Sequence, residues 1–238
     1  DFGPSDPDAG RPSRRRHPAR EHDDARAVRA RADGRAGALP YTPRAPRAHH
    51  SRCPATQEIP PLEALIGGGV PEERLVIVIP GSGGPDANTR RIVDALDRAY
   101  GSRATRTVEV DWRTWKGNEV QAPFAARRLG ARLGGQLRAS ARQPRALHLV
   151  GVSVGAHVAD ALAEAYAAAS PSSRAHVRLT LLDPFTARGA IGVAVPRASL
   201  GVRSFGKHAD YCEAVVNTDD PVPATNEPLS RALNYDVT

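Results

Sequence analysis

The sequence predicts an α/β fold built on an open, mostly parallel β-sheet with helices on both faces. Apolar runs typical of strands alternate along the chain with amphipathic or alanine-rich stretches of helical character, and short turns separate them. The first strand-like run, Leu75–Ile79, is apolar at every position. A strand without polar residues on either face belongs inside a parallel sheet that helices cover on both sides.

The predicted elements begin with a connector, Pro60–Val70, that holds a short helix at 62–66. Beyond it, short apolar runs typical of strands alternate with longer helical patterns, such as the apolar stripe of Ile92, Val93, Leu96 and Ala99. Strands are predicted at 75–79, 106–112, 146–152, 177–182 and finally 211–216, and helices at 89–100, 119–141 and about 154–169. Parallel strands end at one edge of a sheet, and ligands bind there. Side chains that follow these strand ends are therefore the candidates for a functional site.

Residues 1–57 differ in composition from the domain that we predict at 58–238. They hold 12 arginines against seven acids, with many prolines and alanines and no aliphatic periodicity, so we expect a disordered tail. The tail carries +5 of the formal net charge of +7. Since the domain is nearly neutral, we expect no nucleic-acid partner for it. A tail that binds anions or nucleic acid, through arginines such as Arg14–Arg16, is a separate hypothesis.

Composition also argues against several other classes of protein. The cysteines, Cys53 in the tail and Cys212 in a predicted strand, do not indicate a disulfide framework. No apolar run approaches the roughly 18 residues of a transmembrane helix, and no signal peptide is visible. We expect neither a metal nor a cofactor. The sequence indicates no compartment and no oligomeric state.

The run Gly151–Gly155 has the form Gly-x-Ser-x-Gly and lies between a predicted strand and an alanine-rich helix. This order predicts a nucleophile elbow, a sharp strand-to-helix turn that presents a serine hydroxyl. The two glycines leave room beside a strongly twisted backbone. Ser153 is therefore the candidate nucleophile. The Val154 N–H is the candidate first donor of an oxyanion hole.

A glycine-rich loop, Gly81–Gly84, follows the first strand. Its Ser82 N–H is the candidate second donor to an oxyanion, because the flanking glycines let the backbone approach closely. A phosphate-binding loop is the competing interpretation. The loop lacks Gly-Lys-Ser/Thr, and Asp86 stands where Gly-x-Gly-x-x-Gly requires its last glycine. The oxyanion interpretation is favoured.

Three segments occur in the order VEVDWR at 108–113, GVSVGAH at 151–157 and TLLDP at 180–184. Together they resemble the pancreatic-lipase-like family of α/β hydrolases over about residues 75–220. The resemblance implies an α/β-hydrolase fold, hydrolysis of esters in lipid-like substrates, Ser153 as nucleophile and Asp183 as the acid of a triad. The chain has Pro-Gly-Ser at 80–82 where the family has His-Gly-Phe, and Val152 where it often has His. These departures concern lipid specificity more than hydrolase chemistry.

The acid of the triad has two candidates. Asp183 follows the strand at 177–182, as the resemblance implies, and Asp219 follows the next strand, where most other α/β hydrolases have their acid. Either strand end could bring a carboxylate to the imidazole that it must orient. Asp183 is preferred. The other would be a capping or turn residue.

The catalytic base is not evident. The fold requires a histidine that follows the acid and the last strand. His157 lies one helical turn beyond Ser153, and we predict that it is a packed histidine. His208 alone follows Asp183, but it precedes the strand at 211–216, so it is a weak candidate base. We expect the catalytic histidine, and the lid that the family places there, beyond Thr238, so that the chain would be a C-terminally incomplete lipase domain.

The sequence thus predicts a serine hydrolase that cleaves carboxylic ester bonds through a Ser-Asp-His triad. Its expected partner is a small lipid-like or other ester substrate. The alternative is a non-catalytic pseudo-hydrolase, or a binding module, with the same fold.

Overall fold

The computed structural model describes seven segments of the chain, which together cover most of the predicted domain. They are residues 59–71, 73–101, 103–118, 121–168, 174–186, 200–222 and 224–238. The predicted tail at 1–57 lies outside the described residues.

Six parallel strands form the sheet, in the order β2-β1-β3-β4-β5-β6. They are β1 (Arg74–Ile79), β2 (Thr105–Glu109), β3 (Ala146–Val152), β4 (His176–Leu182), β5 (Tyr211–Val216) and β6 (Leu233–Asp236). Because every pair is parallel, all strand carboxyl ends meet at one edge of the sheet. The α/β class and the parallel sheet are confirmed.

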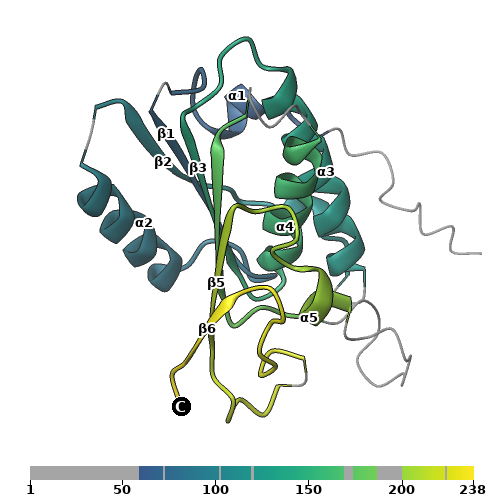
Figure 1. The fold of residues 1–238 in the computed structure, drawn as a ribbon. Helices are drawn as coiled ribbons and strands as arrows, with labels where there is room; N and C mark the ends of the chain where they lie inside the picture. The colour runs from purple at the N-terminus through teal and green to yellow at the C-terminus, as the bar shows by residue number, and fades with distance from the viewer. Residues whose placement is uncertain are drawn as a thin grey trace, which may run out of the picture. The chain divides into compact units, whose positions relative to one another are not determined.

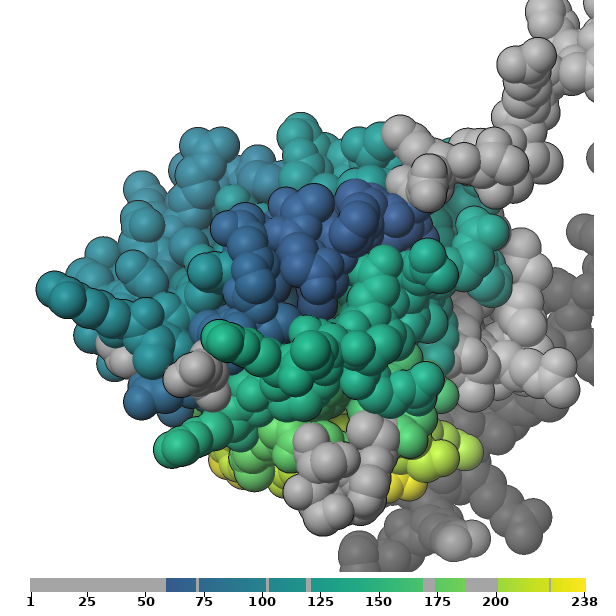
Figure 2. Space-filling view, turned by 90° about the horizontal axis from the view of Figure 1, so that it is seen from above, coloured from purple at the N-terminus to yellow at the C-terminus, as the bar shows by residue number. Residues whose placement is uncertain are grey.

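Helices lie on both faces of this sheet, as Figure 1 shows: α2 covers one face, and α3 and α4 cover the other. The helices of the described segments are α1 (Leu62–Leu65), α2 (Ala87–Tyr100), α3 (Ala122–Ala139), α4 (Gly155–Ala167) and α5 (Leu200–Ser204), with a 3₁₀ turn, η1, at Arg113–Trp115. Seen from above, the segment around α1, coloured blue, lies at the front (Figure 2). The side chains of its Leu62 and Ile66 are buried.

The hydrophobic core lies between the sheet and the helix pair α3 and α4. Leu75, Ile77 and Ile79 of β1 point into it, together with alternate residues of β3, β4 and β5. Nine residues of α3 and ten of α4 are buried, whereas α2 buries only Thr89. One face of the sheet is therefore packed far more completely than the other.

The predicted strands and helices are found, with their ends shifted by a few residues. For example, α3 begins at Ala122 rather than 119, and Pro123 lies in its first turn, where proline is well tolerated. The prediction that 211–216 is the last strand is wrong, because β6 follows it and pairs with it. The short helix α5 was not predicted either. The four residues of β6 are Leu-Asn-Tyr-Asp, all exposed, so no apolar run marks them.

Candidate active site

Ser153 lies at the turn between β3 and α4 with a backbone φ of +51°, in the left-handed region that non-glycine residues rarely adopt. Both flanking glycines are required by close contacts. A Cβ on Gly151 would lie 2.8 Å from the Cα of Ala156, and one on Gly155 would lie 2.4 Å from the carbonyl oxygen of Ile79. The predicted sharp strand-to-helix turn is therefore present, and Gly155 also allows it to press against the end of β1.

Main-chain hydrogen bonds tie this turn to the segment that follows β4. The Ser153 N–H donates to the Leu182 carbonyl at 2.9 Å, and the Phe185 N–H donates to the Ser153 carbonyl at 3.1 Å. The backbone of Ser153 is thus held at both its N–H and its carbonyl, and the serine side chain is half-buried. It lies beside the first turn of α4, where the helix dipole is positive.

The glycine-rich loop comes close to the serine. A Cβ built on Gly81 would lie 3.4 Å from Ser153 Cβ and 3.9 Å from Ser153 Oγ. Within the described segments, neither the Ser82 N–H nor the Val154 N–H donates a hydrogen bond to another group of the chain. The structure therefore brings Ser153, the loop and two unused N–H groups to one place.

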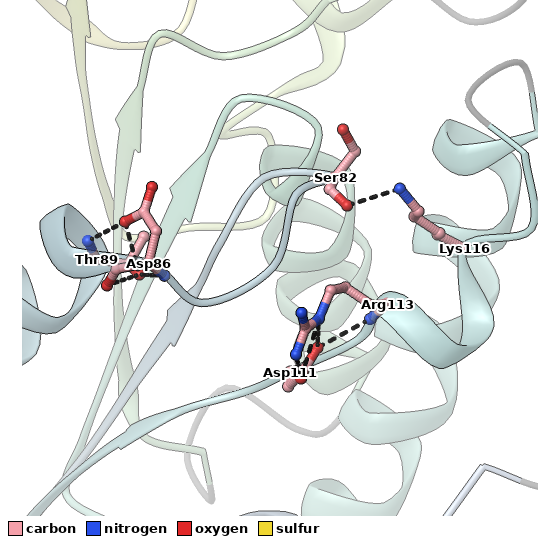
Figure 3. Close-up of polar contacts among 6 residues, drawn as sticks. All are labelled: Ser82, Asp86, Thr89, Asp111, Arg113 and Lys116. Carbon is pink, nitrogen blue, oxygen red and sulfur yellow. Dashed lines mark hydrogen bonds and ion pairs between the residues drawn. The ribbon is translucent and has the colours of Figure 1, made fainter.

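The loop is braced by residues that follow β2. The buried Trp112 donates from Nε1 to the Pro80 carbonyl at 2.7 Å. Lys116 Nζ donates to the Ser82 carbonyl at 2.8 Å (Figure 3). Both contacts hold carbonyls, so they leave the Ser82 N–H available. The sequence analysis missed this role. Its one signal was that Lys116 is one of only two lysines in an arginine-rich chain.

An ion pair shapes the same bracing segment. Arg113 Nη2 lies 2.5 Å from Asp111 Oδ2, and the hydrogen bond from Arg113 lowers the pKa of Asp111 (Figure 3). Gly84 of the loop has a φ of +78°, and a Cβ there would lie 2.3 Å from Arg113 Cδ. The VDWR motif thus folds into a support for the glycine-rich loop, against which the arginine packs closely.

Asp183 is the carboxylate nearest to Ser153 in the register of the sheet. Val152 pairs with Leu182, so Ser153 and Asp183 are the first residues after two adjacent strands, whose backbones are about 4.8 Å apart. Asp183 also has a left-handed φ of +43°, and its Oδ1 accepts a bond from the Asn217 N–H at 3.1 Å. The side chain is exposed, so its remaining acceptor sites can be reached from outside.

Asp219 lies at the same edge of the sheet but one strand farther from Ser153. It follows β5 in a turn in which its N–H donates to Asn217 Oδ1 at 3.1 Å, and its side chain is exposed. The neighbouring Asp220 accepts bonds from the Val222 N–H and from Thr225 Oγ1. The two candidate acids thus share an edge, and Asp183 is the closer in register.

None of the histidines in the described segments lies at Ser153. His208 precedes β5, so the strand, about 20 Å long for its six residues, separates it from the edge that holds Ser153. His157 is buried in α4 against the rings of Phe185 and Phe205, at 6.4 and 5.0 Å between centroids. It is packed, as predicted. The structure brings together Ser153, Ser82, Val154 and Asp183, and it leaves His208 at the opposite edge.

Two further observations concern ligands and membranes. The described residues hold no group of three or more side chains that could bind a metal ion. In the same part of the chain, no helix has the length and hydropathy that crossing a bilayer requires.

Comparisons with solved structures concern the fold. At a TM-score of 0.42 and 14% identity, 69% of this chain aligns with 87% of a protein from Xanthomonas campestris pv. campestris assigned to the alpha/beta superfamily of hydrolases. At a TM-score of 0.36 and 14% identity, 67% of it aligns with 60% of an alpha/beta hydrolase enzyme from a Medee basin deep-sea metagenome library. Scans of protein-family models and of curated proteins found no match. Neither likeness extends to the pancreatic-lipase-like family.

Proposed function

We propose that the protein is a serine hydrolase that cleaves carboxylic esters, with Ser153 as its nucleophile. The observation that carries the proposal is the conformation of Ser153. This non-glycine residue has a backbone φ of +51°, which is strained. It lies on a strand-to-helix turn between two glycines at which a Cβ would be too close to neighbouring atoms. Such strain is typical of a nucleophile elbow, where it exposes the hydroxyl at the strand end.

The surrounding groups suit the chemistry of ester cleavage. Ser153 Oγ would attack the ester carbonyl carbon, and the negative charge that develops on the carbonyl oxygen would be accepted by the Ser82 and Val154 N–H groups. The hydroxyl proton would pass to a histidine and from there to the leaving alcohol, and water would then release the acid from the acyl-enzyme. Asp183 would orient that histidine.

The base would come from outside the described residues. Preference for lipid-like substrates is the finer part of the proposal. Its support is the resemblance of the VEVDWR, GVSVGAH and TLLDP segments to pancreatic-lipase-like enzymes. In the structure, Trp112 of the first of these segments donates to the carbonyl of Pro80, directly before the loop that would carry the oxyanion donor Ser82.

A fluorophosphonate probe on the full-length protein tests the proposal, because it reacts covalently only with an activated serine. The wild type should be labelled, and Ser153→Ala should not. Ser230→Ala is the matched control, since Ser230 is an exposed serine whose hydroxyl bonds the Val202 carbonyl, and it should be labelled as the wild type is. Ser82→Ala keeps the N–H that the mechanism uses and should also be labelled. Labelling that survived Ser153→Ala would overturn the assignment.

The second candidate function is a non-catalytic binding module with the same fold. The observation that favours it is that no histidine of the described segments reaches Ser153. A folded full-length protein that neither reacts with the probe nor hydrolyses short-chain and long-chain p-nitrophenyl esters would support it. Labelling at Ser153 with ester turnover would exclude it.

A further inference from the structure

The face of the sheet beneath α2 is only partly covered. Five α2 residues border a hollow of about 460 Å³ between this helix and the sheet, yet Ile92 and Leu96 are only half-buried, and Ala95 and Ala99 are exposed. The strand side of this apolar hollow includes Val150 and Leu182. Its walls are thus mainly aliphatic.

A second hollow of about 530 Å³ lies at the amino ends of β1, β3, β4 and β5. Its walls hold arginine, histidine and tyrosine side chains, and we call it the basic hollow. The residues that matter here are Arg74, Tyr100, His148, His176, Arg178 and Tyr211. Tyr100, His148 and Arg178 also line the apolar hollow, so the two hollows adjoin. Each volume is in the range of small-molecule sites, about 300–1,000 Å³.

Where the two hollows adjoin, which we call the junction, the polar side chains are linked by successive hydrogen bonds. The Tyr100 hydroxyl bonds His148 Nδ1, and His148 Nε2 bonds Thr180 Oγ1, both at 2.8 Å. Thr180 donates to Glu213 Oε1 at 2.6 Å, and Arg178 Nη2 donates to the same oxygen at 2.6 Å. The charges of Glu213 and Arg178 therefore offset each other, and the junction is rigid and close to neutral.

Arg74 supplies the charge that is not offset. Its guanidinium lies 4.2 Å above the ring centroid of Tyr100, and no carboxylate among the described residues pairs with it. Asp210 also borders the basic hollow, but its carboxylate is paired with Arg174, which donates to the two carboxylate oxygens at 2.7 and 2.8 Å. The basic hollow therefore carries a net positive charge next to an apolar wall.

We propose that the two hollows form one site for an amphiphilic carboxylate, with its acid group at Arg74 and its hydrocarbon chain along Ile92, Leu96 and Leu182. A charged head alone would leave the apolar wall open to water, and an uncharged chain would leave the arginine without a partner. From Arg178 to Leu182 the strand advances about 13 Å, which suits a medium-length chain. The site does not rest on the chemistry proposed for Ser153.

Titration calorimetry of the full-length protein with sodium decanoate tests this site. Decanoate should bind, and both 1-decanol and acetate should bind at least tenfold more weakly, because each lacks one half of the interaction. Decanol that bound as tightly as decanoate would overturn the proposal. The Ser153→Ala protein should bind decanoate as the wild type does, and loss of binding there would place the ligand at the candidate active site instead.

Two substitutions locate the ligand. Arg74→Gln should weaken decanoate binding at least tenfold and leave decanol unchanged, whereas Arg91→Gln, which removes a charge from an exposed position of α2, should have no effect. Ala95→Trp should weaken binding at least tenfold by filling the apolar hollow from an exposed helix position that tolerates a large side chain. Wild-type affinity in either Arg74→Gln or Ala95→Trp would overturn the proposal. So would sedimentation velocity showing that Ala95→Trp breaks a dimer, because a second copy would then occupy this face.

Discussion

Mild acid should destabilise the protein through His148. The ring is only 4% exposed, and its Nε2 must donate to Thr180, because Thr180 gives its own proton to Glu213. Nδ1 is then the acceptor for the Tyr100 hydroxyl, so the folded state holds a neutral ring. Burial, with the nearby Arg178 guanidinium, lowers the pKa of His148 from 6.5 to about 4.

The sign and size of the effect follow from this pKa. Because the folded value lies below the unfolded one, the unfolded chain takes up the proton first as the pH falls through 6.5. The stability that the neutral ring contributes is complete above that pH. Going from about pH 7.5 to about pH 5 should cost roughly 2 kcal/mol of unfolding free energy, and the full loss near pH 4 should be roughly 3 kcal/mol.

Urea denaturation at the two pH values measures this loss. The free energy of unfolding of the wild type should fall by roughly 2 kcal/mol more between them than that of His148→Gln, whose amide does not titrate. His176→Gln is the control, because His176 is exposed at the start of β4, and it should behave as the wild type does. If the wild type and His148→Gln lose the same free energy, the buried ring is not the source of the acid sensitivity, and the reasoning is wrong.

Four further substitutions probe the candidate active site. Gly155→Ala should lower the unfolding free energy by about 1–3 kcal/mol in urea, since its Cβ would lie 2.4 Å from a carbonyl at the end of β1; unchanged stability would contradict this close contact. Trp112→Phe keeps the aromatic packing but leaves the Pro80 carbonyl without its 2.7 Å bond, so stability should drop by about 1–3 kcal/mol and fluorophosphonate labelling should slow. Asp183→Asn should slow that labelling by orders of magnitude in the full-length protein, whereas Asp219→Asn should leave it near the wild-type rate; the reverse result would exchange the two acids.

The local features of the site could be predicted from the sequence. The turn at Gly-x-Ser-x-Gly follows from local sterics, because a Cβ on either glycine would lie too close to a neighbouring atom. For Gly151 the neighbour is Ala156, close in the chain, and for Gly155 it is Ile79 at the end of the adjacent strand β1. The strands at 75–79 and 146–152 were equally visible, since they are buried on both faces: the first is apolar throughout, and His148 is the one polar side chain of the second.

Features that depend on distant contacts could not be predicted. The bonds from Trp112 and Lys116 to the glycine-rich loop join residues more than 30 positions apart, and no periodicity encodes them. The same holds for the series of hydrogen bonds that runs from Tyr100 through His148 and Thr180 to Glu213. Strand β6 forms by main-chain pairing with β5 although its side chains are exposed, so a search for apolar alternation passes over it.

The most direct test of the account is to map the fluorophosphonate adduct on the folded full-length protein by peptide mass spectrometry. The account predicts one adduct, on the peptide that contains Ser153, and none after denaturation has removed the strained turn. An adduct on any other serine, or a folded protein that carries no adduct at all, would contradict the claim that Ser153 is an activated nucleophile.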